Sequence, residues 1–254
     1  MSMISRMLRS PLHADLVEML EATRATEHDL FGALPPERRE IPGADGGWSA
    51  KDVWAHLAAW RSIEARRLEA ALRAEGAAPG APSGDDPAPS DPIDASNARL
   101  QAMHADWSWE AVGREADASV DALIDAIRRS SREMLCECDG IVAGLGSNGV
   151  NHAIGHLPDI ATQAGKLRRV DRLAAETEAI LQRDHLPARD TGVILYNLAC
   201  HYALAGKLDE ARRLLRDAFG RRPDLIESAP QDPDLVALGD ELVSLAEPDR
   251  RDPA

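Results

Sequence analysis

Apolar residues recur at steps of three and four positions along most of this chain, and this spacing predicts helices rather than strands. The first such segment covers residues 11–34. Its apolar positions are Leu12, Leu16, Met19, Leu20, Leu30 and Leu34. Pro35 and Pro36 follow directly, and they predict the end of the helix because proline lacks the amide hydrogen that a helix needs.

The second helical segment opens with the sequence GWSAKDVWAHLAAW, residues 47–60. Ser49 is a predicted N-cap, and Asp52 stands three residues later as the acidic half of a capping box. We expect the helix to continue to about residue 75. Its apolar stripe contains Val53, Leu57, Trp60, Leu68 and Leu72. His56 lies on the same stripe, either as a core residue with a hydrogen-bond partner or as part of a site.

Two further long helices are expected in the first part of the chain. Residues 76–93 are rich in Gly, Pro, Ser and Asp and predict a flexible surface connection, followed by a short helix. A third long helix is expected over 108–135, with Ser108 as its cap. Four glycines in CECDGIVAGLGSNG then predict a break, and a fourth helix is expected to begin near Val150. Four long helices with short or flexible connections are typical of a four-helix bundle.

The last third of the chain has a different pattern. Residues 167–183 are expected to form one amphipathic helix, and residues 194–223 match the helix–turn–helix unit of tetratricopeptide repeats. The matching positions are Leu198, Ala199, Tyr202, Ala211, Leu215, Ala218 and Pro223, with Gly206 in the turn. The predicted fold is therefore all-α, with a four-helix bundle over 1–165 and a small tetratricopeptide-like domain over 166–254. One repeat leaves apolar faces uncovered, so we expect it to stack on its neighbouring helices or on the bundle. A protein partner or self-association through 166–254 is the alternative.

Composition excludes several classes of function. Net charge is -14, with 43 acidic against 29 basic residues, so binding to a phosphate backbone is not expected. No run of about 18 apolar residues predicts a membrane span. The first ten residues lack the apolar stretch of a secretory signal. No GxSxG, P-loop or dinucleotide-binding motif is present.

The chain has three cysteines, an odd number, and two of them form the pair Cys136-x-Cys138. Such a pair is a poor disulfide candidate, so reduced thiols and a cytoplasmic protein are expected. Two nearby thiols are also soft metal ligands, but we favour ordinary cysteines at a helix end.

Histidine spacing provides the strongest candidate for chemistry. His152 and His156 are four residues apart and therefore share one helical face. With His56 from a facing helix they would form a three-histidine site inside the bundle, which leaves one coordination position of a metal open. Imidazole suits Zn, Ni, Fe or Cu, and we expect a divalent ion, Zn or Ni first. The alternative is three metal-free histidines with hydrogen-bond partners.

Neighbouring residues have two interpretations each. Asp52 lies one turn before His56, so it either orients the imidazole or serves only the capping box. Trp60 either lines a ligand pocket, together with Trp48, or belongs to the core. Pro158 lies two residues after His156 and predicts a kink or a local opening of the helix there.

The segments GWSAKDVWAHLAAW, IDASNARL and NHAIGHLPDI together resemble the DinB-like superfamily of four-helix bundles, and its ClbS/DfsB branch in particular. The resemblance covers residues 10–165, and the pattern W-S-x-K-D-V-x-A-H-L is its most specific part. The C-terminal third resembles the tetratricopeptide tails of bacterial proteins.

This resemblance implies a site and an activity. In many DinB-like proteins three histidines, at the positions of His56, His152 and His156, bind a divalent metal. Many members have Arg-Gly-Gln after the last of them, whereas this chain has the sequence LPD, which is typical of the ClbS/DfsB branch. Asn97 matches a polar residue frequent in that branch, although asparagine is also common where a helix begins.

The ClbS/DfsB branch includes a self-resistance hydrolase that opens a cyclopropane warhead on a DNA-damaging natural product, and other superfamily members are thiol-dependent transferases. We therefore expect a small-molecule ligand and either metal- or water-dependent hydrolysis of an electrophilic compound or thiol transfer. The alternative is a non-catalytic scaffold that binds a partner through the C-terminal domain.

Overall fold

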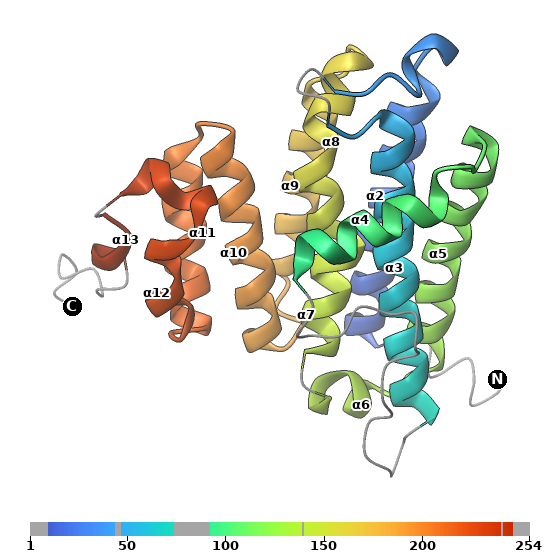
Figure 1. The fold of residues 1–254 in the computed structure, drawn as a ribbon. Coiled ribbons are helices and arrows are strands. Elements are labelled where there is room, and N and C mark those ends of the chain that lie inside the picture. Colours follow the sequence, from blue (N-terminus) through green and yellow to red (C-terminus); the bar gives the residue numbers. More distant parts are fainter. Residues whose placement is uncertain (1–9, 44–46, 74–91, 139, 240, 246–254) are drawn as a thin grey trace, which may run out of the picture. The chain divides into compact units, whose positions relative to one another are not determined.

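The computed structural model describes residues 10–43, 47–73, 92–138, 140–239 and 241–245. These residues form helices and turns, with no strand among them, which confirms the predicted all-α class (Figure 1). No helix in the described ranges is long and apolar enough to cross a membrane. The chain divides into two compact units, Met1–Thr177 and Glu178–Ala254. The division lies within α9 (Arg168–Leu181), whereas the sequence placed the boundary before that helix.

The first two helices begin and end close to where the sequence places them. Helix α2 covers Pro11–Gly32, and α3 covers Ala50–Arg73. The capping box at the start of α3 is present, since the backbone N–H of Ser49 donates to Asp52 Oδ2 at 2.9 Å and that of Asp52 donates to Ser49 Oγ at 3.2 Å. Most of the expected connection, residues 76–91, lies outside the described residues.

The predicted third helix is two helices, preceded by the short α4 (Ile93–His104). Helix α5 covers Trp109–Arg129, and Ser108 Oγ caps it by accepting the N–H of Ala111 at 3.2 Å. Ser130 is extended and ends α5, and its hydroxyl donates to the carbonyl of Ala126 at 2.8 Å. The next serine, at position 131, caps α6 (Arg132–Glu137) through the N–H of Met134. The two helices are therefore separated by adjacent serines, one hydrogen-bonded to the backbone of α5 and the other to the backbone of α6.

The predicted glycine break is present only at its start, where α6 ends at Glu137 and Gly140 adopts φ 77°. The other three glycines of the segment do not interrupt the helix, so the prediction that a new helix begins near Val150 is wrong. Helix α7 (Ile141–Gly146) continues through a π-helical turn, η2 (Ser147–Asn151), into α8 (His152–Gln163), which includes Pro158. Two of the glycines are sites of close packing. A Cβ atom at Gly144 would lie 2.8 Å from the carboxyl carbon of Glu64, and one at Gly149 would lie 2.7 Å from Leu20 Cδ2.

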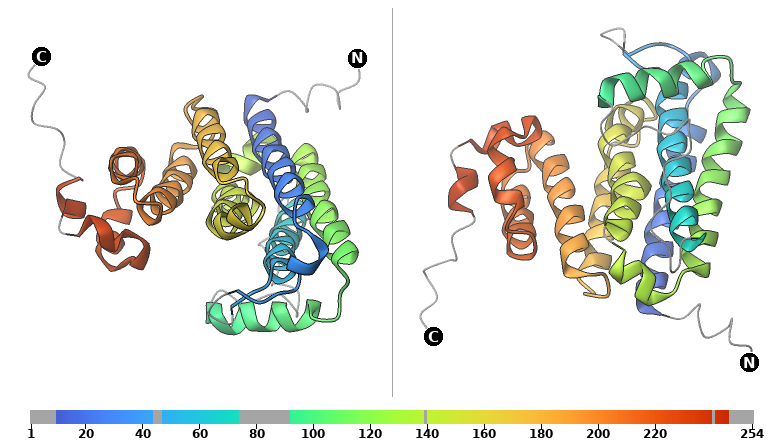
Figure 2. Two further views of the ribbon diagram at one scale, coloured as in Figure 1. Left: turned by 90° about the horizontal axis from the view of Figure 1, so that it is seen from above. Right: turned by 60° about the horizontal axis from the view of Figure 1, so that its bottom comes forward.

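Helix α3 has the most neighbours in the first unit. It packs along α5 and also contacts α4, α7, η2 and α8, while α2 contacts α5, η2 and α8. The end-on view in Figure 2 shows α2, α3, α5 and α8 running roughly alongside one another, with α4 lying across α3. The buried face of α3 therefore meets α5 and α8, and side chains of α3 also contact α2, where Arg61 pairs with Glu27 and Trp54 stacks on Phe31.

The second unit begins within α9 and contains the expected helix–turn–helix. Helices α10 (Ala188–Leu204) and α11 (Leu208–Arg221) pack against each other. Ala199 and Ala211 are fully buried, and Gly206 adopts φ 72° in the turn, where glycine is favoured. Short helical pieces follow: α12 (Leu225–Ser228), η3 (Ala229–Gln231), η4 (Pro233–Leu238) and α13 (Glu241–Ser244).

The side chains of this unit include one polar anchor. Asp232 Oδ2 accepts a hydrogen bond from the hydroxyl of Tyr196 at 2.8 Å, which connects the start of η4 to α10. Cys200 lies near the same carboxylate, and all three cysteines are free thiols.

A buried ion pair connects α2, α3 and α5 in the first unit. Arg61 donates to both oxygens of Glu27, at 2.5 and 2.9 Å, and the two side chains are 1% and 3% exposed. The Nε of Arg61 also donates to Ser119 Oγ at 3.1 Å, and that hydroxyl donates to the carbonyl of Ala116 at 2.7 Å. Breaking this network leaves a charge buried without its partner.

We therefore expect Glu27→Ala to lower the free energy of unfolding by about 3–5 kcal/mol, because the guanidinium of Arg61 stays buried and unpaired. Replacing both residues by apolar ones, Glu27→Leu with Arg61→Met, is expected to recover most of that loss. Urea unfolding followed by circular dichroism measures both. The control is Glu21→Ala at the partly exposed pair with Arg24, with an expected loss below about 1 kcal/mol. A loss for Glu27→Ala no larger than this control would contradict the argument.

Candidate metal centre

Three histidines converge between two helices of the first unit. His56 comes from α3, and His152 and His156 come from the first two turns of α8. The ring centroids are 4.6 Å apart for His56 and His152, 4.9 Å for His56 and His156, and 4.8 Å for His152 and His156. One potential ligand atom from each residue lies within 4.8 Å of the others. The structure thus brings together the three residues that the sequence proposed.

The spacing of the ring nitrogens suits a shared ion. Nε2 of His56 and Nε2 of His152 are 2.8 Å apart. Two imidazole nitrogens that bind one tetrahedral zinc at about 2.0–2.1 Å lie roughly 3.3 Å apart, so a small shift of either ring would admit the ion. Without an ion, one of the two nitrogens must carry the proton and the other must accept it.

The outer nitrogens of two of these rings have no partner. Nδ1 of His56 and Nδ1 of His152 are buried and have no hydrogen bond within the described part of the chain. In most metal sites that nitrogen donates to a carboxylate or a carbonyl, which fixes the tautomer. No such group holds either ring among the described residues, so the contact between the two Nε2 atoms is what sets the tautomers.

All three imidazoles are neutral near pH 7. Burial, together with the nearby charge of His156, lowers the pKa of His56 to about 3. Burial and the other two histidines place the pKa of His152 well below its ordinary value, and burial lowers the pKa of His156 as well. Because a metal binds the neutral imidazole, the cluster is in its ligand form without loss of a proton.

Two tryptophans flank the cluster. The ring of Trp48 lies 4.3 Å from that of His56 and 5.8 Å from that of His156. Trp60 lies 6.4 Å from His56 and 6.1 Å from the first histidine of α8. Trp60 Nε1 donates to Asn97 Oδ1 at 3.2 Å, so a residue of α4 fixes the orientation of this ring. Trp60 thus borders the site, and Asn97 acts on it through Trp60.

Asp52 does not orient His56, so that interpretation is corrected. Its Oδ2 accepts from the N–H and, at 2.6 Å, from the hydroxyl of Ser49. Nδ1 of His56 has no partner in the part of the chain that the structure describes, and its Nε2 faces His152. Asp52 instead serves as the acidic residue of the capping box at the N-terminal turn of α3.

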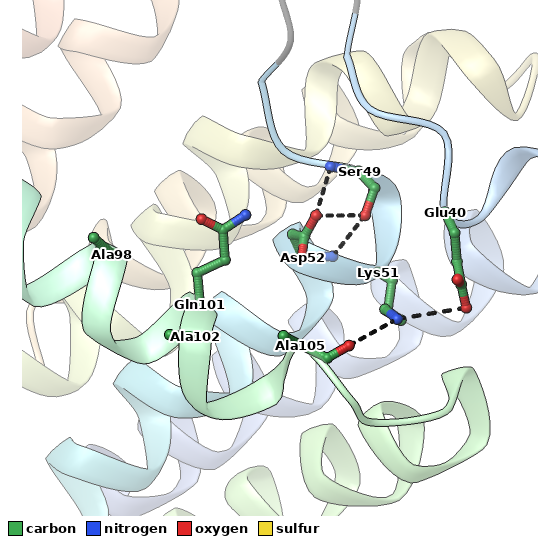
Figure 3. A pocket seen from close by; sticks show the side chains of 8 residues that line it. All are labelled: Glu40, Ser49, Lys51, Asp52, Ala98, Gln101, Ala102 and Ala105. Carbon is green, nitrogen blue, oxygen red and sulfur yellow. Dashed lines mark hydrogen bonds and ion pairs between the residues drawn. The ribbon is translucent and has the colours of Figure 1, made fainter.

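A pocket of about 320 Å³ opens beside the capping box, between the start of α3 and helix α4. Figure 3 shows Gln101 extending from α4 toward Asp52, and Lys51 on the far side of the pocket. The ammonium of Lys51 donates to the carbonyl of Ala105 at 3.3 Å and pairs with Glu40 at 3.5 Å. Asp52, which lines this pocket, lies one helical turn before His56 on α3, and the three histidines themselves are not among the lining residues.

Sequence reasoning missed one buried acid near the cluster. Glu64 is 3% exposed and accepts a hydrogen bond from Asn148 Nδ2 at 3.0 Å. A signal was present, because Glu64 continues the four-residue series His56, Trp60 on the buried face of α3. The partner Asn148 lies in the π-helical turn, which the sequence pattern did not indicate.

The chain matches no family model, no curated protein and no solved structure. The resemblance to DinB-like proteins therefore stays a prediction, and the interpretation of the site depends on its geometry.

The low pKa values predict acid sensitivity of the metal-free protein. In the unfolded chain these histidines take up protons near pH 6.5, but in the folded protein they do so at lower pH, for His56 at about 3. The unfolded state therefore binds more protons between these values. The free energy of unfolding should fall as the pH decreases, by up to about 1.4 kcal/mol per pH unit for each histidine.

We expect His56→Gln to reduce this slope, because its side chain does not titrate. Urea unfolding in the presence of a chelator, at several pH values between about 7 and 4, measures the slope. His28→Gln is the control, since this residue lies on the exposed surface beside Asp117. The pKa argument is wrong if His56→Gln keeps the wild-type slope.

Proposed function

We propose that the first unit is a DinB-like four-helix bundle in which His56, His152 and His156 bind a divalent metal ion beside a small-molecule pocket. The observation that carries this proposal is the convergence of three neutral imidazoles from two helices. The packing of α2, α3, α5 and α8 supports the bundle. Three imidazole nitrogens suit zinc or nickel, and they leave at least one coordination position for water or a ligand.

Each residue of the site has a distinct task in this proposal. The histidines hold the ion, which when bound polarises a water molecule or a substrate oxygen. Trp48 and Trp60 flank the ligand space with apolar surface, and Asn97 keeps Trp60 in place. Trp48 is only partly buried, so the ligand space opens on its side.

The reaction that fits best is hydrolysis of an electrophilic small molecule. An open three-nitrogen centre with apolar walls provides a polarised water and excludes bulk solvent. Transfer of a thiol to the same kind of electrophile is the alternative reaction at this centre. The pocket beside Asp52 and Lys51 supplies space and polar groups for the ligand.

A non-catalytic scaffold is the second candidate function. The helix pair α10 and α11, with Ala199 and Ala211 buried between its helices, supports a tetratricopeptide-like domain that binds a protein or a second copy of the chain. Size-exclusion chromatography with light scattering tests self-association. A monomer that copurifies with metal favours the first candidate, and a metal-free oligomer favours the second.

Protein purified without a histidine tag is expected to contain about one zinc or nickel ion per chain, measured by elemental analysis, because three ligand nitrogens already converge. After chelation, titration with Zn²⁺ in a calorimeter should restore binding to one site. His156→Ala should abolish this binding or weaken it by at least about 100-fold, since the ligand set falls to two.

His28→Ala is the matched control, because it removes an exposed histidine far in sequence from the cluster. It should bind zinc as the wild type does. Copper titration gives a second readout, in which the ion quenches tryptophan fluorescence and Trp48→Phe reduces the quenching. Absence of metal from the wild type, together with equal zinc titrations for all variants, would remove the basis of the metal proposal.

A further inference from the structure

Glu64 is a buried acid that the proposed function does not use. Its side chain is 3% exposed, and burial raises its pKa above the ordinary value. Among the described residues it is hydrogen-bonded to Asn148, at 3.0 Å, and to Arg67, whose guanidinium is 40% exposed and lies 3.5 Å away. A carboxyl group is costly to bury, so a residue in this position needs a structural or functional reason.

The backbone of α7 leaves space for this carboxyl group. A Cβ atom at Gly144 would clash with Glu64 Oε1 and would lie 2.8 Å from its carboxyl carbon. Any larger residue at position 144 therefore displaces the carboxyl group or separates α7 from α3. The carboxyl group of Glu64 thus occupies the space that a side chain at position 144 would fill.

The partner of Glu64, Asn148, lies four residues before His152. Asn148 is in the π-helical turn η2, which ends at residue 151, and α8 begins with His152. A π-helical turn is an irregular insertion in a helix, and it changes the direction of the side chains that follow. The Glu64–Asn148 hydrogen bond joins this turn to α3, the same helix that carries His56.

Two side-chain contacts thus connect α3 with the η2–α8 segment, and their order along the two segments is that of antiparallel helices. His56 meets His152, and eight residues further along α3 Glu64 meets Asn148, four residues before His152. Trp60 lies between the two pairs on α3 and contacts the ring of His152. The second pair fixes the register in which the first pair meets.

We infer that Glu64 is a positioning residue for the histidine cluster: by holding Asn148 it fixes the π-helical turn and thereby the direction of His152. The effect on metal affinity rests on the proposed metal function, whereas the effect on the histidine rings does not. Gly144 contributes to the same arrangement, because its lack of a side chain leaves space for the carboxyl group.

Four variants test this inference, with Zn²⁺ as the probe in calorimetric titrations of the full chain. Glu64→Ala removes the acceptor, and Gly144→Ala displaces it from the opposite helix. Both should weaken zinc binding by about 10–100-fold, the usual effect of losing a group that orients a metal ligand. Glu64→Gln still offers an oxygen to Asn148 and should retain the wild-type affinity. Asn148→Ala, at a half-buried position, is the mildest way to remove the bond.

Gly113→Ala is the matched control for Gly144→Ala. A Cβ atom there would lie 2.8 Å from Cη2 of Trp54, so it disturbs the packing of α3 against α5 without touching Glu64. It should lower the melting temperature and leave the zinc affinity unchanged. A purely structural role for Glu64 would give the same result for Glu64→Ala, namely lower stability with unchanged affinity.

A second readout does not need metal. In chelator-treated protein, ¹H–¹⁵N spectra of the histidine rings should show displaced His152 signals in Glu64→Ala and Asn148→Ala, and wild-type signals in Glu64→Gln. If the wild type binds no zinc, the metal proposal fails and these spectra still decide the inference. If zinc is bound with equal affinity by all variants, or the ring signals do not move, the inference is overturned, whereas the metal proposal depends only on whether the wild type binds zinc.

Discussion

Helix α3 places four polar side chains in an apolar interior, and the first unit is arranged around satisfying them. His56 meets His152 of α8, and Trp60 donates to Asn97 of α4. Arg61 pairs with Glu27 of α2 and with a serine of α5. Glu64 accepts from Asn148 of the π-helical turn. Because a buried polar group without a partner is costly, each contact fixes the register of a different neighbour against α3.

The same arrangement connects stability with the chemistry of the site. Burial and the neighbouring histidines lower the pKa of His152, and the positive charge of Arg61 lowers it further. That charge stays in the interior only because Glu27 neutralises it. The charge of Arg61 thus favours the neutral imidazole that a metal requires, and Glu27 keeps that charge paired in the interior. A substitution at Glu27 should for this reason affect the histidines as well as the packing.

The sequence predicted the features that depend on local pattern. Apolar spacing located the long helices, the Ser49–Asp52 pair located the start of α3, and Ser108 capped α5 as expected. Helical spacing together with a third histidine was sufficient to propose a converging cluster. Local patterns did not predict the role of a residue where that role depends on a partner distant in sequence. Gly144 was interpreted as a helix breaker, although the structure shows that it accommodates a carboxyl group from α3.

The role of Glu64 was hidden for the same reason. Its position on the buried face was visible, but its partner lies in a π-helical turn for which no sequence rule was available. The division of the third helix depended on two adjacent serines, each of which bonds to the backbone on its own side. Propensity alone does not choose between a serine within a helix and a serine that ends one, because the choice depends on the packing of the flanking segments.

The question of whether the cluster is structural or functional comes down to its unpaired atoms. A histidine kept for stability in a core normally has partners for both ring nitrogens. Here the hydrogen-bond partner of His56 is another histidine, and the outer nitrogens of both rings are buried without a partner among the described residues. Three apolar side chains of similar volume would avoid that cost. What distinguishes this cluster from a single core histidine is that three neutral imidazoles have their ring centroids 4.6, 4.9 and 4.8 Å apart, with Glu64 bound to the turn before them. Arrangements that break a local rule in this way are concentrated at functional sites.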